Sequence, residues 1–513
     1  MSLRSSLLVL FLAAAPAAAQ DVLLKVEADK PGAKIDRHIF GQFAEHLGHG
    51  IYEGVWVGPD SDIPNTRGIR NDVVAALKAI KVPNIRWPGG CFADEYHWRG
   101  GIGPKERRRA MVNTNWGGVI EPNTFGTHEF FDFIEQVGAD AYVSVNVGSG
   151  TVQEAAEWME YMTAVHPTAL AQERVGNGRK APFQVPFVGL GNENWGCGGA
   201  MSADYYVDLM KAFARYTRNY DPDQKSKLIA VGPDGAKTEY TEAVMKAWSE
   251  RVWSWTIDGL SLHNYTLNGW PPSVKATGFG EPEYAKFIEE TLGMDTLIRT
   301  HSAIMDKYDP EKEVALVVDE WGAWLAPAEG TNPGFLVQQN SMRDAILAAL
   351  NLNIFARHAE RVRVANIAQM VNVLQAMILT DKEQMLLTPT YHVFHMYVPF
   401  QDAAFVPVAF DKGRYTVGDV VLPRVDAIAA KAADGTLWVA VTNVDAGRAV
   451  EVGLEVAGFD AASARGLLLT APRVDAVNTF EAKDTVAPRP VTLSNGRLQL
   501  PPHSVAVVGL KPR

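Results

Sequence analysis

Cysteine is scarce in this chain of 513 residues, which has only Cys91 and Cys197. Two cysteines do not make a disulfide framework of the kind that stabilises small secreted domains. Neither belongs to a CxxC pair, so a structural zinc site is not expected. The fold must therefore depend on its hydrophobic core. With 47% hydrophobic residues, the chain is long enough to form two domains.

Basic residues are also in deficit, with 48 against 59 acidic residues and a formal net charge of −11. This balance argues against nucleic acid or a membrane as a partner and fits a neutral substrate. Beyond the N-terminus, no apolar run is long enough for a transmembrane helix. The G-x-S-x-G motif of esterases is missing, and Gly89-Gly90 lacks the Lys-Ser/Thr continuation of a phosphate-binding loop.

The N-terminus has one apolar run, at 7–15, preceded by the single charge of Arg4. The run is too short to span a bilayer as a mature helix, and Ala17-Ala18-Ala19 has the small side chains of a signal-peptide cleavage site. We therefore expect residues 1–19 to be a signal peptide and the mature chain to be exported, either periplasmic or secreted. A buried N-terminal helix is the alternative.

Short apolar runs alternate with longer helical stretches over much of the chain. Several runs are nearly continuous in Val, Ile and Leu, as expected of strands buried on both faces. Amphipathic stretches at 71–81, 127–137 and 202–219 lie between them. Such units predict an α/β fold, a parallel (β/α)8 TIM barrel over 39–390. The runs are 39–43, 82–87, 141–147, 186–191, 228–231, 259–263, 314–318 and 363–367.

The sequence pattern changes after residue 391. Segments 437–444 and 450–456 alternate apolar and polar residues, and 498–508 does so less regularly, with Pro501-Pro502 interrupting it. Asp434-Gly435 is a hairpin turn signal. These features predict a C-terminal antiparallel β-sandwich over 391–513. The strand-like start of 20–38 is expected to join this sandwich.

Polar and aromatic residues follow the predicted strands, where the active site of a (β/α)8 barrel lies. Glu193 follows the fourth run and Glu320 the seventh, so the two side chains can converge across the barrel. Glycoside hydrolysis needs a carboxylic acid to protonate the leaving oxygen and a second carboxylate at the anomeric carbon. The pair therefore predicts a glycoside hydrolase. The alternative, a loop salt bridge, accounts for one such Glu more readily than for two.

Other side chains near the strand ends fit this interpretation. Asn192, directly before Glu193, can hold a ring hydroxyl beside the acid. A metal site is disfavoured because the candidate ligands His46, His97 and His263 lack metal-ligand spacing. Candidate platforms for sugar rings, each of which could instead pack under a loop, are Trp116, Trp195, Tyr265, Trp321 and Trp324.

The chain resembles glycoside hydrolase family 51, the α-L-arabinofuranosidases, and the resemblance covers most of the mature chain. The matching stretches, in order, are FGQFAEHLGHGIYEGVW from Phe40, NIRWPGGCFADEYHWRGGIGP from Asn84, EPNTFGTHEFFDF from Glu121, NVGSGT from Asn146, GLGNENWGCGG from Gly189, SLHNYT from Ser261, VVDEWGAW from Val317 and NIAQMVNVLQAM from Asn366. The resemblance implies a (β/α)8 barrel with a jelly-roll-like sandwich. It also implies retaining, exo-acting release of terminal arabinofuranosyl residues from arabinan or arabinoxylan, without a cofactor or metal.

The resemblance also implies roles for individual residues. Glu193 matches the acid/base and Glu320 the nucleophile. Cys91 stands at a position expected to touch the sugar, where many members have Asn, and Gly100-Gly101 replaces a usual Asp-Gly. The sugar-holding positions are Glu45, Asn192, His263, Tyr265 and Gln369, and the pocket walls are Trp116 and Trp324.

Several alternatives stay open at this point. A β-glycosidase or endoglucanase on the same scaffold is one, and a non-catalytic carbohydrate-binding protein is another. Cys91 and Cys197 each follow a glycine just beyond a strand at the same face of the barrel. They either form a disulfide, or Cys91 is free and packs against the sugar. Relatives are often homo-oligomers, so the oligomeric state is open as well.

Overall fold

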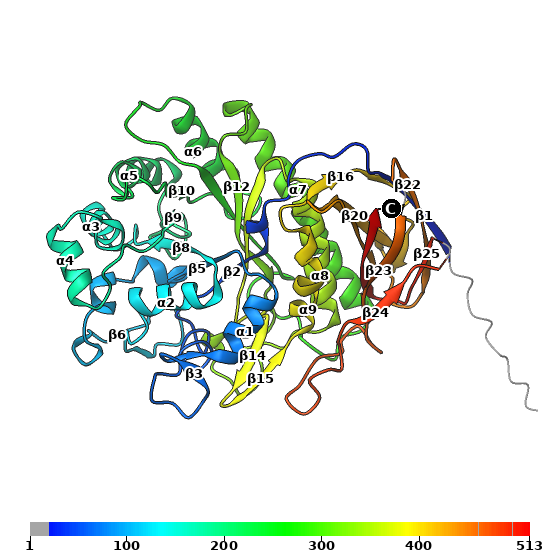
Figure 1. The fold of residues 1–513 in the computed structure, drawn as a ribbon, viewed down its shortest axis with the longest axis horizontal. Coiled ribbons are helices and arrows are strands. Elements are labelled where there is room, and N and C mark those ends of the chain that lie inside the picture. Colours follow the sequence, from blue (N-terminus) through cyan, green and yellow to red (C-terminus); the bar gives the residue numbers. More distant parts are fainter. Residues whose placement is uncertain (1–19, 460, 495, 513) are drawn as a thin grey trace, which may run out of the picture.

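The computed structural model describes residues 20–459, 461–494 and 496–512. The predicted signal peptide, 1–19, lies outside these residues. Figure 1 shows a barrel surrounded by helices and, beside it, a β-sandwich that contains the C-terminus. No helix of the described residues is long and apolar enough to cross a membrane.

Eight parallel strands close the barrel, and neighbours in the barrel follow one another along the chain. This confirms the predicted (β/α)8 barrel, because each strand overlaps one of the apolar runs. The first run is shortened: residues 39–40 belong to a 3-10 turn (Arg37–Phe40) that the Asp36 side chain caps. The strands are β2 (Gly41–Phe43), β5 (Asn84–Trp87), β8 (Asp140–Val145), β9 (Phe187–Leu190), β10 (Lys227–Ala230), β11 (Gly259–Thr266), β12 (Ala315–Ala323) and β13 (Val362–Ile367).

The predicted amphipathic stretches are helices. For example, α2 begins where the Glu129 side chain accepts from the backbone N–H of Gly126, and it ends at Gly138, whose φ of 81° suits glycine. The α8 helix is buried along most of its length because it lies between the barrel and the sandwich (Figure 1). The helices are α1 (Asn71–Ala79), α2 (Thr127–Val137), α3 (Val152–Thr163), α4 (Ala169–Gly176), α5 (Ala203–Tyr216), α6 (Glu239–Ser249), α7 (Glu281–Tyr308), α8 (Met342–Arg357) and α9 (Pro389–Tyr397).

Short elements decorate the barrel. Four two-stranded hairpins pair β3 with β4, β6 with β7, β14 with β15 and β18 with β19. Their bounds are β3 (Asn65–Thr66), β4 (Ile69–Arg70), β6 (Met111–Val112), β7 (Ile120–Glu121), β14 (Ile378–Asp381), β15 (Gln384–Leu387), β18 (Tyr415–Val417) and β19 (Val420–Leu422). A 3-10 turn, η2 (Cys91–Asp94), follows β5 and matters for the site below.

Two sheets form the predicted C-terminal sandwich, in the orders β17-β1-β22-β25 and β16-β20-β21-β26-β23-β24. Buried Leu24, Val439 and Val508 from the two sheets share one apolar core. The strands are β1 (Gln20–Glu27), β16 (Ala404–Val406), β17 (Val408–Ala409), β20 (Val425–Lys431), β21 (Leu437–Asn443), β22 (Val450–Ala457), β23 (Ala461–Leu469), β24 (Arg489–Thr492), β25 (Arg497–Leu500) and β26 (Ser504–Pro512).

Two details of the sandwich differ from the simple antiparallel expectation. The segment 498–508 falls into two strands of different sheets, because Pro501 and Pro502 cannot donate to a ladder and mark the crossing between the sheets. The first strand, β1, pairs with β22 in parallel, from Gln20 opposite Val450 to Glu27 opposite Ala457. No hairpin can make that pairing, since β1 reaches the sheet from the other end of the chain.

Replacing Leu24 with Ala should destabilise the sandwich. Leu24 is 0% exposed in the shared core, so the substitution leaves a cavity and should lower the free energy of unfolding by about 2–4 kcal/mol. The matched control is Leu23→Ala on the opposite face of β1, where the side chain is 42% exposed. It should cost less than about 0.5 kcal/mol in the same urea titration. Equal losses for the two variants would show that β1 is not packed as described.

Candidate active site

The candidate site is a small pocket at the carboxyl ends of the barrel strands. Most of the residues predicted from sequence line it; Asn192 and His263 are not among the lining residues but lie directly beside them. Wider hollows of about 860 Å³ near Trp56 and about 730 Å³ near Trp253 contain neither catalytic candidate. The lining consists of Glu45, Leu47, Gly90, Cys91, Trp116, Glu193, Tyr265, Glu320, Trp324, Leu336, Gln369 and Leu374.

His263 connects the two glutamates. Its Nδ1 donates to Oε1 of Glu193 at 2.8 Å and lies 3.5 Å from Oε2 of Glu320. A carboxylate oxygen of each glutamate and a ring nitrogen of His263 all lie within 4.8 Å of one another. The convergence of Glu193 and Glu320 that the sequence predicts is therefore present.

Arg86 and Tyr265 hold the carboxylate of Glu320 in place. Nη1 of Arg86 donates to Oε1 of Glu320 at 2.8 Å, and the Tyr265 hydroxyl donates to Oε2 at 2.8 Å. Nη2 of Arg86 also donates to Oδ1 of Asn192 at 2.6 Å. One buried guanidinium thus positions the Glu320 carboxylate and the residue before Glu193 together.

Asp319 also faces the barrel interior, although it directly precedes Glu320. The β12 strand shifts register between Val318 and Trp321, and such a bulge lets consecutive side chains share a face. Oδ2 of Asp319 accepts from the Tyr142 hydroxyl at 2.7 Å, and Oδ1 lies 3.2 Å from Nε2 of His263. Burial opposes ionisation of Asp319, but the Arg86 charge and the His263 contact outweigh it and lower the pKa.

Glu45 links the pocket walls. Its Oε1 accepts from the backbone N–H groups of Gly90 and Phe92 and from the Trp116 indole, at 2.9, 3.1 and 2.9 Å. Its Oε2 accepts from the Gln369 side chain at 2.9 Å. Burial and the neighbouring Glu320 raise the pKa of Glu45 to about 7, although these donors favour the carboxylate.

The pKa values of Glu193 and His263 move upward for different reasons. Burial, followed by the charge of Glu320, raises the pKa of Glu193, which favours the protonated acid. Burial lowers the pKa of His263, but the charge of Glu320 and the contacts with Asp319 and Glu193 more than compensate and raise it to about 10. His263 is therefore an imidazolium at neutral pH.

One atom each of Glu193, His263 and Glu320 lie close enough together to hold a metal ion, but Nδ1 of His263 is hydrogen-bonded to Glu193 in this cluster. The other two histidines considered from sequence are engaged elsewhere. His46 uses both ring nitrogens, with Glu121 at 2.8 Å and Trp87 at 3.0 Å, and His97 contacts Glu154 at 3.0 Å.

The aromatic candidates separate into two groups. Trp116, Tyr265 and Trp324 line the pocket, and the Tyr265 and Trp324 rings meet edge to face at 5.0 Å. Trp321 is not a sugar platform: it is 0% exposed and packs on Phe394 in the core, because it points away from the barrel interior. Trp195 packs against the core beside the pocket and does not line it.

The Gly89-Gly90 pair makes room for the carboxylates and is not a phosphate cradle. A Cβ on Gly89 would lie 2.5 Å from Cγ of Glu45, and one on Gly90 would lie 2.9 Å from Oε1 of Glu320. Only glycine permits this close approach of the β5 loop to both acids.

Three residues that hold the site were not singled out from sequence: Arg86, Asp94 and Asp319. Arg86 lies inside a predicted buried strand, and a charge at such a position signals a buried ionic network. Asp94 accepts from the backbone N–H groups of Val147, Gly148 and Asn192 at 2.7, 2.7 and 2.8 Å, so it ties two loops together. Burial raises its pKa to about 7.

The structure distinguishes between a Cys91–Cys197 disulfide and a free Cys91 thiol. Cys91 and Cys197 form a disulfide, with 5.5 Å between their Cα atoms. Cys91 still lines the pocket, as predicted, but not as a free thiol.

Comparison with known proteins identifies the family of this fold and site. Two family models match the chain, the α-L-arabinofuranosidase 1 domain over residues 76–249 and the α-L-arabinofuranosidase C-terminal domain over 319–504. A protein of Bacteroides ovatus named intracellular exo-α-L-arabinofuranosidase is 45% identical over 501 residues, 96% of each chain.

A solved structure agrees with the sequence matches. The family 51 arabinofuranosidase of Xanthomonas axonopodis pv. citri matches with a TM-score of 0.93 and 52% identity, over 96% of this chain and 100% of that one. The chain belongs to the α-L-arabinofuranosidases of glycoside hydrolase family 51. The α-L-arabinofuranosidase of Thermotoga maritima, solved with arabinose, matches with a TM-score of 0.81 and 31% identity over 95% of this chain and 99% of that one.

Family membership confirms that the chain is a glycoside hydrolase, as the resemblance implied. The expectation of a periplasmic or secreted location is contradicted by the Bacteroides ovatus relative, which is named intracellular. The prediction depended on residues 1–19 alone. A short apolar run behind one basic residue is compositional information.

In this family 51 enzyme, Arg86→Lys should impair catalysis more than folding. A lysine ammonium is a compact point charge that cannot reach Glu320 and Asn192 together, so both would lose their common support. We expect kcat/KM on an aryl arabinofuranoside to fall by about 10²-fold. The control is Arg357→Lys, which alters a pair with Asp426 far from the pocket. If both variants keep wild-type kcat/KM, Arg86 does not position the site.

Proposed function

We propose that this enzyme is a retaining, exo-acting α-L-arabinofuranosidase that releases terminal arabinofuranosyl residues from plant polysaccharides such as arabinan and arabinoxylan. A small pocket walled by Trp116, Trp324 and Leu336 suits one terminal sugar better than the middle of a polymer. The Bacteroides ovatus relative is itself named an exo-acting enzyme, and the Thermotoga maritima relative was solved with arabinose.

The separation of the two carboxylates carries the proposal of retention. Retaining glycosidases hold their carboxyl groups about 5–5.5 Å apart, whereas inverting enzymes leave about 6.5–9.5 Å for a water molecule. In this site a Glu193 oxygen and a Glu320 oxygen lie within 4.8 Å. This close approach of two oxygens is nearer to the retaining than to the inverting separation, and it supports direct attack by a carboxylate.

The surroundings of the two glutamates support different roles. Burial and the Glu320 charge raise the pKa of Glu193, as a general acid requires. Glu320 instead accepts from Arg86 and Tyr265, which hold its carboxylate for in-line attack. We therefore assign Glu193 as the acid/base and Glu320 as the nucleophile.

The reaction then proceeds in two steps. Glu193 gives its proton to the leaving oxygen while Glu320 attacks the anomeric carbon, which forms a glycosyl ester. Glu193, now a carboxylate, takes a proton from water as the water attacks the same carbon and releases the sugar with retained configuration. The imidazolium of His263 donates to Glu193 and can stabilise its ionised state between the steps.

The remaining pocket residues are assigned to sugar binding. Glu45, Gln369 and Asn192 offer polar groups for ring hydroxyls. Gln369 donates to Glu45 and Arg86 donates to Asn192, so all three are oriented before the sugar arrives. Trp116 and Trp324 form apolar walls, and the Cys91–Cys197 disulfide borders the pocket near Glu193.

The ring form of the substrate tests the proposed specificity. A 4-nitrophenyl α-L-arabinofuranoside should have a kcat/KM about 10²-fold higher than the β-D-xylopyranoside or β-D-glucopyranoside, because pre-oriented polar groups penalise a sugar that cannot pair with them. Steady-state kinetics on the three substrates measures this. Faster turnover of either pyranoside would replace the proposal with a β-glycosidase.

Substrates with different leaving groups distinguish the roles of the two glutamates. Glu320→Ala should lose activity on every glycoside, because no substrate bypasses the covalent bond. Glu193→Ala should still form the glycosyl ester from a dinitrophenyl furanoside, which barely needs a proton, yet lose about 10²–10⁴-fold on oligosaccharides. The control is Glu106→Ala, an exposed glutamate that does not line the pocket, which should keep full activity.

Rescue by azide and the pH dependence of kcat/KM test the same assignment of Glu193 and Glu320. Azide needs no base, so it should restore turnover of Glu193→Ala and give a glycosyl azide with the configuration of the substrate. Because the acid form of Glu193 is the active one, wild-type kcat/KM should fall as pH rises through its raised pKa, and this alkaline fall should vanish in Glu193→Ala. An inverted azide product, or rescue of Glu320→Ala instead, would reverse the assignment.

A further inference from the structure

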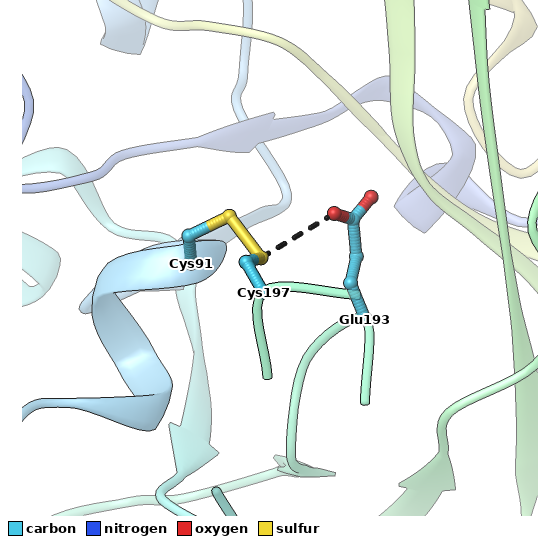
Figure 2. Close-up of side chains that lie close together, drawn as sticks. All are labelled: Cys91, Glu193 and Cys197. Atoms are coloured by element: carbon cyan, nitrogen blue, oxygen red, sulfur yellow. Dashed lines mark hydrogen bonds between the residues drawn. A yellow bond between two sulfur atoms is a disulfide. The ribbon is translucent and has the colours of Figure 1, made fainter. Parts of the chain in front are cut away.

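The disulfide joins the turn after β5 to the loop that carries Glu193. Cys91 lies in η2 just after β5, and Cys197 lies in the loop after β9 that contains Glu193. Figure 2 shows the two sulfurs bridging these loops beside the Glu193 carboxylate. The two cysteines are the only ones in the sequence, and both are placed at the site.

The contact between the disulfide and Glu193 is direct. Sγ of Cys197 lies 3.6 Å from Oε2 of Glu193 and 3.8 Å from Nδ2 of Asn192. A disulfide sulfur carries no hydrogen, so the contact with the carboxylate is one of packing. It restricts where that carboxylate can swing, while His263 holds its other oxygen at 2.8 Å.

The backbone of this loop is held in an unfavourable conformation. Glu193 has a φ of 41° and Ala200 a φ of 51°, in the left-handed region that residues other than glycine seldom occupy. The backbone carbonyl oxygen of Glu193 accepts from the N–H groups of Gly196 and Gly198 at 2.7 and 3.1 Å. Such strain persists only where surrounding contacts over-determine the conformation.

The 3-10 turn η2 holds the Glu193 loop on both sides of Glu193. On the N-terminal side, Asp94 of η2 accepts from the N–H of Asn192 at 2.8 Å. On the C-terminal side, Cys91 of the same turn is bonded to Cys197. Opening the disulfide would leave only the Asp94 anchor between this turn and the Glu193 loop among the interactions described above.

We propose that the Cys91–Cys197 disulfide is a positioning element for the proton donor, and that its reduction makes the enzyme selectively poor at reactions that need a proton. The proposal rests on the assignment of Glu193 as acid/base. The cysteines themselves take no part in the bond-breaking steps. Their effect is on the distance between the Glu193 carboxyl and the leaving oxygen, and about 1 Å of displacement can cost about 10²-fold in rate.

The bond is accessible to a reductant because Cys197 is exposed at the pocket rim. A dithiol such as dithiothreitol supplies the electrons and protons. Its thiolate attacks one sulfur to form a mixed disulfide, its second thiol closes a cyclic disulfide, and Cys91 and Cys197 are released as thiols. Removal of the reductant and mild oxidation reverse the change.

The experiment compares oxidised and reduced wild-type enzyme on two arabinofuranosides, one with a dinitrophenyl and one with a poor alkyl leaving group. Thiol titration verifies the redox state. Reduction should lower kcat/KM on the alkyl glycoside by about 10-fold to 10²-fold and change it by less than about twofold on the dinitrophenyl glycoside. Azide should restore kcat of the reduced enzyme on the dinitrophenyl glycoside, and reoxidation should restore both activities.

Two variants sharpen the result. Cys197→Ser, which does not alter a pocket-lining side chain, should show the leaving-group dependence of the reduced enzyme without any reductant. Its response to dithiothreitol should be nil, which excludes effects of the reagent elsewhere. If Cys197→Ser does not fold, the reversible reduction of the wild type decides alone.

Each outcome has one meaning. Equal loss on both substrates, or no loss on either, overturns the positioning role, since general loosening of the pocket does not discriminate between leaving groups. Glu193→Ala, measured with its disulfide intact, separates the two proposals. If it lacks the leaving-group dependence, the acid/base assignment fails. If it has that dependence and the reduced enzyme does not, only the role of the disulfide fails.

Discussion

The Arg86 guanidinium crosses the barrel interior from β5 and meets groups that arrive from β9 and β12. It donates to Glu320 and Asn192 and lies 3.6 Å from Asp319. Arginine does not lose its proton in a protein, so this charge is a fixed quantity around which the acidic groups are arranged. Without it, the adjacent buried carboxylates of Asp319 and Glu320 would lose the guanidinium that both contact.

Buried ion pairs add little net stability, since desolvation consumes most of the attraction. The benefit of the arrangement is geometric. A planar guanidinium fixes the carboxylate of Glu320 and the amide of Asn192 relative to one another, and the loop that begins at Asn192 carries Glu193. Two identical side chains thereby acquire unlike surroundings: Glu320 has cationic and hydroxyl donors, and Glu193 has an imidazolium and a disulfide. His263 contacts both carboxylates.

Much of this structure was predictable because strands that are buried on both faces appear in the sequence as continuous apolar runs. Continuous apolar runs predicted the barrel strands, and the polar residues after them predicted Glu193 and Glu320, whereas Glu45 was assigned from the family resemblance. No sequence pattern indicated the bulge in β12. The sequence analysis therefore gave Asp319 no role in the site and placed Trp321 on the side of the strand that faces the pocket. Alternation of side chains is a reliable guide only while the ladder is regular.

Contacts between distant segments were harder to foresee. Glu45, Trp116 and Gln369 come from three separate segments, and their shared hydrogen bonds follow from barrel closure, which no local pattern encodes. The cysteine pairing was open for the same reason. The location of the enzyme was predicted from residues 1–19 alone, which lie outside the described residues, so the described site could not check it.

The parallel pairing of β1 with β22 constrains how the chain can be assembled on the ribosome. The first described strand is synthesised before the whole barrel, yet its partners, β17 and β22, begin at residues 408 and 450. Throughout that interval β1 has unpaired backbone groups and an apolar face, the features that make a strand prone to pair with foreign chains. Completion of the sandwich is therefore a late, long-range event, and a truncated product that ends before β22 would leave β1 without its main partner.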